Sequence, residues 1–414
     1  MRREKPHYVY NWDYNKETSM YDKSDYRSNL YKGKWEKAWL KEIASYAVKR
    51  KISLYEAMWL RANDKKEHMP KSLFKFFPFN ENSIKCIEKN TVYMNNPRNF
   101  NDPFDSFLCA NEDEYVKKCL IDYLIETDAI SRGVLSENEL LKLKESRVED
   151  TEYWNIYETF DSVVLHLCYD ANTKKMKDCD SEINHIICIA RCEYKNKLEQ
   201  LRANAVGITS FANINEFKLA TYMELWSHYA QNHQGFCVEY DLTQSITNTN
   251  ENAMVMGGLL PCNYAAKQII ISKNKIYKYI KNIPFTQYEQ MEFDKAIMLS
   301  FLTKSSSWRY ENEWRLILPL DICDIYGKMV PFFPIKAIYT GCRMSDDNRE
   351  FIYRFAQSAG ISVYDMSMHE YKFELERDYS PVDVERYFKD KTEYNMDRLR
   401  NSKYNFWKWN YNLK

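Results

Sequence analysis

Glycine is scarce in this chain, which argues against one large group of nucleotide-binding folds. Only 9 of the 414 residues are glycine, and the sequence contains neither a GxGxxG nor a GxxxxGK motif. Folds that hold phosphates in a glycine-rich loop depend on such motifs, because glycine lets the backbone approach the phosphate closely. The composition therefore disfavours the ATP-binding folds that use these loops.

An excess of charge and long apolar runs are also missing. Lysine plus arginine and aspartate plus glutamate both number 59, so no overall charge attracts nucleic acid or an anionic membrane surface. The sequence has no run of about 18 apolar residues, and its first residues lack the apolar segment of a signal peptide. We therefore expect a cytoplasmic protein that does not contact a membrane.

The 11 cysteines are odd in number and form no CxxC pair. This pattern predicts reduced thiols rather than the disulfide framework of a secreted protein. Cys188 and Cys192 lie one helical turn apart and close to His185. The three residues have two interpretations, a metal site or ordinary buried thiols, and the lack of a fourth ligand at a familiar spacing favours buried thiols.

Changes of pattern along the chain predict an α+β protein with a mixed or antiparallel sheet. Residues 1–70 are expected to form an N-terminal helical extension. The α+β core is expected at 71–345, interrupted by a mostly helical insertion at 110–204. Residues 346–414 are expected to form a C-terminal extension that packs on the core or on the N-terminal helices.

Both ends of the chain are rich in aromatic residues. Tyrosines are frequent in residues 1–34, and residues 405–411 contain Phe, Trp and Tyr. Aromatic segments of this kind are seldom left in water, because burying an aromatic ring is strongly favourable. We expect these segments to contact the rest of the chain, a partner protein or a second copy in a homo-oligomer.

The segment Trp308–Arg315 concentrates charge. In an extended strand Glu311 and Glu313 would face the same side, because side chains alternate. One carboxylate could then orient or deprotonate a nucleophile while the other stabilises positive charge on a sugar, with Arg309 and Arg315 lowering both pKa values. The alternative interpretation is an edge strand whose charges simply alternate with apolar residues.

Two further segments concentrate polar side chains. His228 and His233 are five residues apart, which does not fit the four-residue spacing of a helical zinc site. Each could carry a proton, bind a substrate or satisfy buried backbone groups. In the loop Asn99–Asp105, Phe100 and Phe104 are expected to anchor in the core. The loop is either purely architectural or directs Asn101 or Asp102 into a cleft.

Four segments in this order resemble a bacterial family known as domain of unknown function 2971. The resemblance runs from about Leu73 to Arg343, with the predicted insertion between its parts, and it implies no activity. The four segments are Leu73–Phe76, Asn99–Asp105, Leu225–Asp241 and Trp308–Arg315.

The order of strands and polar residues is also similar to that of toxin-type ADP-ribosyltransferases. This more distant resemblance implies that Lys75 holds NAD, where the family has arginine or histidine. Thr209 and Ser210 would shape the nicotinamide pocket, Glu313 would stabilise an oxocarbenium-like ribose, and Glu311 would guide the acceptor. Lys75 departs from the family pattern, because its ammonium group lacks the planar, bidentate geometry of a guanidinium.

The chemistry that this resemblance implies is coherent. Breaking a glycosidic bond to a cationic leaving group needs mainly a carboxylate near the developing ribosyl charge and an aromatic ring to stack on nicotinamide. Further residues are expected to contact the NAD or to stack on it. They are Tyr229, His228, Asn101, Asp102 and Trp308, with Trp314 and Phe211 as additional stacking candidates.

Three functions therefore remain open. The first is an NAD-consuming ADP-ribosyltransferase or NAD glycohydrolase, acting as a toxin or anti-phage effector on a protein or nucleic-acid acceptor. The second is a non-catalytic binding or sensing module of a defence system, whose aromatic ends contact partners. The third is a metal-dependent nuclease. Its metal site would be assembled from Asp102, Asp105, Glu311, Glu313 and Lys304.

Overall fold

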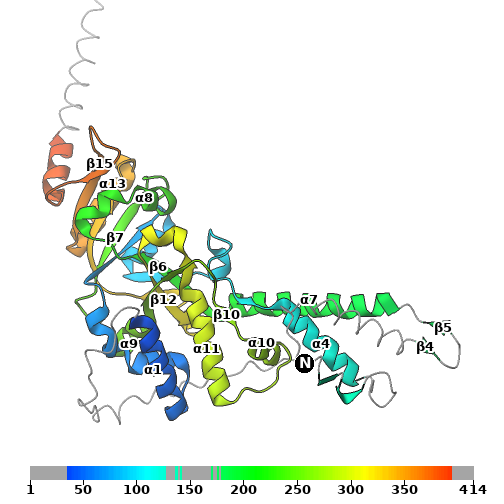
Figure 1. Cartoon of the computed structure of the whole chain (residues 1–414). Helices are drawn as coiled ribbons and strands as arrows, with labels where there is room; N and C mark the ends of the chain where they lie inside the picture. The colour runs from blue at the N-terminus through cyan, green and yellow to red at the C-terminus, as the bar shows by residue number, and fades with distance from the viewer. Residues whose placement is uncertain are drawn as a thin grey trace, which may run out of the picture.

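The computed structural model describes residues 35–126, 136–138, 140–141, 169–170, 175–176 and 179–393 (Figure 1). The aromatic segments at 1–34 and 405–411, for which contacts were predicted, lie outside these residues.

An eight-stranded sheet forms the centre of the described chain (Figure 1). Its neighbouring strands are antiparallel, except that β14 and β15 are parallel. The predicted α+β class with a mixed sheet is therefore confirmed. In spatial order the strands are β16 (Leu375–Arg377), β15 (Ser362–Met368), β14 (Ile335–Thr340), β7 (Phe236–Asp241), β1 (Ser72–Phe77), β6 (Val206–Ala212), β12 (Glu313–Pro319) and β8 (Leu259–Pro261).

Among the described residues, four pairs of short strands lie outside this sheet, and the pair β4 (Tyr169–Asp170) and β5 (Lys175–Met176) lies at the far end of an arm (Figure 1). The antiparallel pairs are β2 (Thr91–Tyr93) with β13 (Met329–Pro331) and β4 with β5. The parallel pairs are β3 (Cys109–Ala110) with β10 (Ile270–Ile271) and β9 (Asn263–Ala265) with β11 (Thr303–Ser305).

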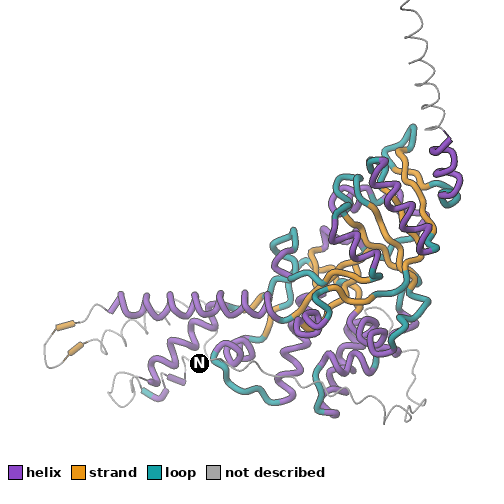
Figure 2. Tube along the Cα trace, turned by 180° about the vertical axis from the view of Figure 1, so that it is seen from behind, coloured by secondary structure: helices purple, strands orange, loops and turns teal. Residues whose placement is uncertain are grey.

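Helices cover both faces of the sheet (Figures 1 and 2). The α-helices are α1 (Trp35–Arg50), α2 (Leu54–Leu60), α3 (Glu81–Glu88), α4 (Glu112–Glu126), α7 (Cys179–Asn204), α8 (Met223–Tyr229), α9 (Thr249–Gly258), α10 (Lys273–Ile280), α11 (Gln287–Leu302), α12 (Leu320–Ile325) and α13 (Asp346–Ala359). The 3-10 helices are η2 (Ala62–His68), η3 (Pro97–Asn99), η4 (Glu216–Thr221) and η5 (Ser306–Glu311).

Strand β12 lies in the interior of the sheet, between β6 and β8, and all of its residues are buried. The sequence analysis offered an edge strand as the alternative interpretation of Trp308–Arg315. Because the residues of this segment that belong to β12 lie inside the sheet, that interpretation is wrong. Two strands of the sheet, β15 and β16, come from beyond residue 345, where the sequence predicted that the core would end. The sheet therefore continues into the segment that was expected to be an extension.

The described part of the N-terminal segment is closely packed against the rest of the molecule. Helix α2 contacts α9, and α1 contacts α11. The Lys65 side chain is fully buried and donates to the carbonyls of Gly257 and Leu259 at 2.9 and 2.6 Å. Its ammonium group also lies 4.5 Å from the ring centroid of Trp39, so these helices share one core with the sheet.

Helices α4 and α7 pack together in an arm that projects from the body (Figures 1 and 2). The Tyr115 hydroxyl donates to Glu193 at 2.7 Å and joins the two helices. Cys188 and Cys192 are exposed on α7, so the interpretation as buried thiols is wrong. No helix in the described ranges is both long and apolar enough to cross a membrane.

Candidate functional site

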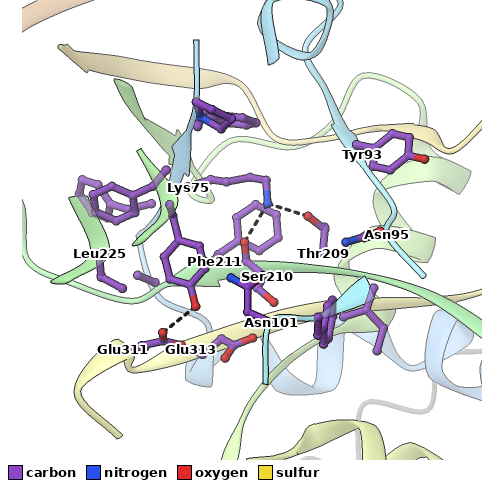
Figure 3. A pocket seen from close by; sticks show the side chains of 18 of the residues that line it. Lys75, Tyr93, Asn95, Asn101, Thr209, Ser210, Phe211, Leu225, Glu311 and Glu313 are labelled. Atoms are coloured by element: carbon purple, nitrogen blue, oxygen red, sulfur yellow. Dashed lines mark hydrogen bonds between the residues drawn. The ribbon is translucent and has the colours of Figure 1, made fainter. Parts of the chain in front are cut away.

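A cavity of about 460 Å³ opens beside strands β1, β6 and β12 (Figure 3). Its walls also include the loop after β2, residues from α8, and the segment that precedes β12. Of the nine residues predicted for the site, His228 does not line this cavity. The other eight do, namely Lys75, Asn101, Asp102, Ser210, Tyr229, Trp308, Glu311 and Glu313.

Glu313 begins strand β12 and is only 4% exposed. One of its carboxylate oxygens accepts from Arg315 Nε and the other from Lys304 Nζ, both at 2.7 Å. Burial alone would raise the pKa of this carboxyl, but the charges of Arg315 and Lys304 outweigh burial and hold the pKa at about 2. Glu313 is therefore ionised at neutral pH.

Glu311 reaches the same place by a different backbone path from the one predicted. It ends the 3-10 helix η5, and the next residue, Asn312, adopts a left-handed conformation with φ of 43°. The prediction of one extended strand carrying both glutamates is therefore wrong. Glu311 accepts from the Tyr229 hydroxyl at 2.8 Å and from Lys304 at 2.5 Å. Burial raises the pKa of Glu311; Lys304 opposes this rise, and the charge of Glu313 adds to it.

Lys304 binds both Glu311 and Glu313 and is therefore the central cation of this cluster of charges. In the sequence analysis it was predicted only as part of a nuclease site. It extends from β11, is 6% exposed, and its Nζ also lies 3.8 Å from Asp105. Arg309 was expected, together with Arg315, to lower the pKa values of Glu311 and Glu313. Its guanidinium instead lies 6.0 Å from the ring centroid of Tyr264.

Arg315 lies behind the cluster and is fully buried. Besides Glu313 it binds Asp105 at 2.6 Å, the carbonyl of Phe301 at 2.6 Å and the hydroxyl of Ser106 at 3.2 Å. A buried cation is stable only when its donors are matched in this way. Arg315 therefore fixes Glu313 from the side that faces the core.

Lys75 projects from β1 into the cavity and is half-buried. Its Nζ donates to Thr209 Oγ1 at 2.8 Å and to the Ser210 carbonyl at 3.1 Å (Figure 3). The ammonium group also lies 5.5 and 5.3 Å from the ring centroids of Phe77 and Phe211. Burial lowers the pKa of Lys75 to about 8, although nearby acidic groups oppose the shift.

Strands β6 and β12 are in register, so that Ser210 lies opposite Arg315 and Ala212 opposite Glu313. Strand β1 joins the other edge of β6, where Phe74 pairs with Ala212. Three neighbouring strands thus carry the lysine, the serine and the glutamate to one cavity. The three side chains converge because strands that are distant in the sequence pair with one another, and short sequence motifs do not predict such pairing.

The loop after β2 closes one side of the cavity. Asp102 accepts from the indole nitrogen of Trp308 at 2.9 Å and from the backbone N–H of Phe104 at 2.9 Å. Asn101 is exposed and lines the cavity. Phe104 is 71% exposed, so its prediction as a core anchor is wrong. Phe100 does pack inward, with its ring centroid 5.3 Å from the guanidinium of Arg315.

A comparison with known protein families adds a finding about the segment that carries the glutamates. Residues 225–316 match the family described as Protein of unknown function (DUF2971). The matched range includes two of the four segments that resemble this family, Leu225–Asp241 and Trp308–Arg315. No curated protein and no solved structure matches the chain. The resemblance to ADP-ribosyltransferases therefore stays a prediction.

The two histidines of the DUF2971-matching range lie outside the cavity lining. His228 is exposed, and its ring centroid lies 6.2 Å from that of Tyr229 and 6.4 Å from that of Trp308. His233 adopts φ of 66° in the turn before β7. Trp314, a stacking candidate, packs in the core, where its ring centroid lies 6.2 Å from that of Trp35. It does not line the cavity either.

The proposed nuclease residues come together only in part. Asp105, Glu311, Glu313 and Lys304 form one cluster, whereas Asp102 is bonded to Trp308 instead. Each of the three carboxylates in the cluster already pairs with Lys304, with Arg315 or with both cations, in the place that a divalent ion would take. Within the described part of the chain, no group of three or more His, Cys, Asp or Glu residues is placed to hold a metal ion.

Proposed function

We propose that this chain cleaves the bond between nicotinamide and ribose of NAD, as an ADP-ribosyltransferase or an NAD glycohydrolase. The observation that carries the proposal is that Lys75, Ser210 and Glu313, from three neighbouring strands, line one cavity. A volume of about 460 Å³ suits a ligand of nucleotide size. The aromatic rings of Phe211 and Tyr229 on its walls offer surfaces for stacking.

The ionisation of Glu313 suits the step that breaks the bond. When the bond between ribose C1′ and nicotinamide N1 breaks, its electron pair moves to N1 and neutralises the pyridinium. Positive charge then develops on C1′ and the ribose ring oxygen, and an ionised carboxylate beside it stabilises this charge. A pKa of about 2 keeps Glu313 available for this role across the physiological pH range.

Glu311 is suited to the second half of the reaction. The nucleophile, water or an acceptor group, forms its bond to C1′ and gives its proton to the Glu311 carboxylate. The raised pKa makes Glu311 a better proton acceptor than an ordinary glutamate, provided that it is ionised. The hydroxyl of Tyr229 and the ammonium of Lys304 hold the carboxylate in place.

The proposal includes a protein or nucleic-acid acceptor and a role as a toxin or anti-phage effector. Its test is to incubate the purified chain with NAD that carries a label in its adenylate part. Nicotinamide release reports cleavage, and label on lysate protein, DNA or RNA reports transfer. We expect release by the wild type and release lowered by about a hundredfold or more in Glu313→Gln. A folded wild-type chain that releases no nicotinamide and labels nothing would contradict the proposal.

One observation favours a second candidate, a binding or sensing module without catalysis. Both carboxylate oxygens of Glu313 are already bonded to Arg315 and Lys304, as they would be in a purely architectural network. In that case Glu313→Gln lowers the melting temperature but leaves ligand affinity and the cellular phenotype intact. Measuring melting temperature, NAD affinity and turnover on the same variant separates the two candidates.

A further inference from the structure

The cavity continues past Lys75 to an end that the proposed reaction does not use. Tyr93, Asn95 and Asn99 line this end. In Figure 3, Tyr93 and Asn95 lie on the side of Thr209 that is away from the two glutamates. The cavity therefore offers two chemically different ends, with the ammonium group of Lys75 between them.

The backbone fixes Asn95 at this end. Its N–H donates to the Ile208 carbonyl at 2.8 Å, and its carbonyl accepts from the Ile208 N–H at 2.9 Å. Side chains alternate along an extended segment. Met94 accordingly faces the core with 1% exposure, whereas Tyr93 and Asn95 line the cavity.

Hydrogen bonds also fix which way the Asn95 amide points. Its Oδ1 accepts from the backbone N–H of Asn96 at 2.9 Å and from Asn99 Nδ2 at 3.3 Å. Because a backbone N–H can only donate, the oxygen must face Asn96, and the nitrogen is left for another partner. Figure 3 shows this nitrogen on the side toward Thr209. Asn99 uses its nitrogen on Asn95, so its oxygen remains an acceptor.

We infer that this end of the cavity is a subsite for an adenine base. Asn95 Nδ2 donates to a ring nitrogen, and Asn99 Oδ1 accepts from the exocyclic 6-amino group. The two side chains together thus offer the donor and acceptor that a single Asn or Gln amide offers to adenine. The Tyr93 ring, 45% exposed, offers a face on which the base stacks. Among the described residues, neither of these two amide atoms has a hydrogen-bond partner.

The inference rests on the proposed function in one respect, because it extends the NAD site from the nicotinamide end to the adenine end. Lys75 lies between the ends and, within the described chain, forms no ion pair with a carboxylate. Its ammonium group is therefore available for the phosphates that join the two halves of a dinucleotide. This arrangement favours a dinucleotide over either mononucleotide.

The test compares adenosine with purine riboside, which differs only by lacking the 6-amino group. Both are neutral, so charge does not contribute to the difference. Titration calorimetry on the full chain should show adenosine binding about tenfold more tightly, as expected for one well-placed base contact. Asn95→Asp keeps the acceptor for Asn96 but removes the donor, so it should weaken adenosine binding about tenfold. Asn282→Asp, the same change in an exposed turn outside the cavity, should leave binding unchanged.

Equal affinity for the two nucleosides, or no adenosine binding by the folded chain, would overturn the subsite. NAD cleavage without adenosine binding would overturn the subsite and leave the proposed reaction standing. Adenosine binding with the expected preference, but without NAD cleavage, would support the subsite and overturn the reaction.

Discussion

Two buried glutamates of this protein have the same kinds of partner. Glu311, 4% exposed, accepts from the Tyr229 hydroxyl at 2.8 Å and from Lys304 at 2.5 Å. The other glutamate, Glu239 on β7, is 1% exposed and also accepts from one tyrosine and one lysine. A comparison of the two shows what separates a candidate site from a structural ion pair.

Both partners of Glu239 lie on β14, the strand that pairs with β7. Tyr339 on β14 donates to it at 2.8 Å, and Lys336 donates at 2.6 Å. The Lys336 side chain is 45% exposed and also reaches Glu216 at 3.3 Å. Solvent and a second carboxylate therefore share this cation, and Glu239 does not line the cavity.

Glu311 differs from Glu239 in two respects. It lines the cavity, and it shares its lysine with a second buried carboxylate, Glu313. Two adjacent carboxylates beside a cavity can divide the stabilisation of charge and the transfer of a proton between them, which a single enclosed carboxylate cannot do. The trio of glutamate, tyrosine and lysine is therefore not evidence of a site by itself.

The largest expected effect belongs to Glu313→Gln. The amide keeps the size and shape of the side chain but removes the charge that stabilises the ribosyl cation. Its nitrogen can only donate, so one of the two bonds that Glu313 accepts from Arg315 and Lys304 is also lost. We expect nicotinamide release to fall by about a hundredfold or more, the range seen when one electrostatic contact to a transition state is removed. Circular dichroism must show that the variant is folded. A folded variant with wild-type turnover would remove Glu313 from the mechanism.

Lys304→Met should have the next largest effect. Without the lysine, Glu311 and Glu313 repel each other, so the pKa of Glu311 should rise further. Because Glu311 must be ionised to accept a proton, the acidic limb of the pH-rate profile should move to higher pH. Turnover at pH 7 should fall about tenfold and recover partly as pH rises. Lys304→Arg, which keeps a cation, is the control; an unshifted profile in a folded Lys304→Met variant would contradict this role.

The sequence predicted the parts of the site that lie within single motifs. The Glu311 and Glu313 pair and the Asp102 loop were identified from local patterns, whereas Lys75 was implied by the resemblance to ADP-ribosyltransferases. The structure brings all of them to one cavity. The local pattern also predicted an α+β class, because strand and helix periodicities differ.

The rest of the site depends on contacts between distant residues. Lys304 comes directly after helix α11 in the sequence, and the pairing of β11 with β9 directs it to the glutamates. The left-handed turn at Asn312 separates two carboxylates that alternation alone would place on one strand. Phe104 is exposed, and a hydrogen bond from its backbone N–H to Asp102 holds this part of the loop. Periodicity carries no information about such long-range or turn geometry.

A smaller effect is expected from the ionisation of Lys75. Its pKa of about 8 means that the ammonium group loses its proton as pH rises through 8. A ligand with phosphates should then bind less tightly, so the KM for NAD should increase several-fold between pH 7 and pH 9 while kcat changes little. Lys75→Arg should give a KM that is nearly constant over this range, because a guanidinium stays protonated. An equal increase in KM for the arginine variant would show that another group titrates.

The smallest effect on turnover is expected from Glu239→Gln, which tests the comparison most directly. The change removes a buried charge from the same kind of trio, but away from the cavity. The free energy of unfolding should fall by about 1 to 3 kcal/mol in urea titrations, because Lys336 loses a charged partner. Lys336 is exposed enough to be solvated, which limits the loss. Nicotinamide release per folded molecule should stay within about twofold of the wild type, since distant sites act independently. If a folded Glu239→Gln variant lost turnover, lining the cavity would not be what separates Glu311 from Glu239.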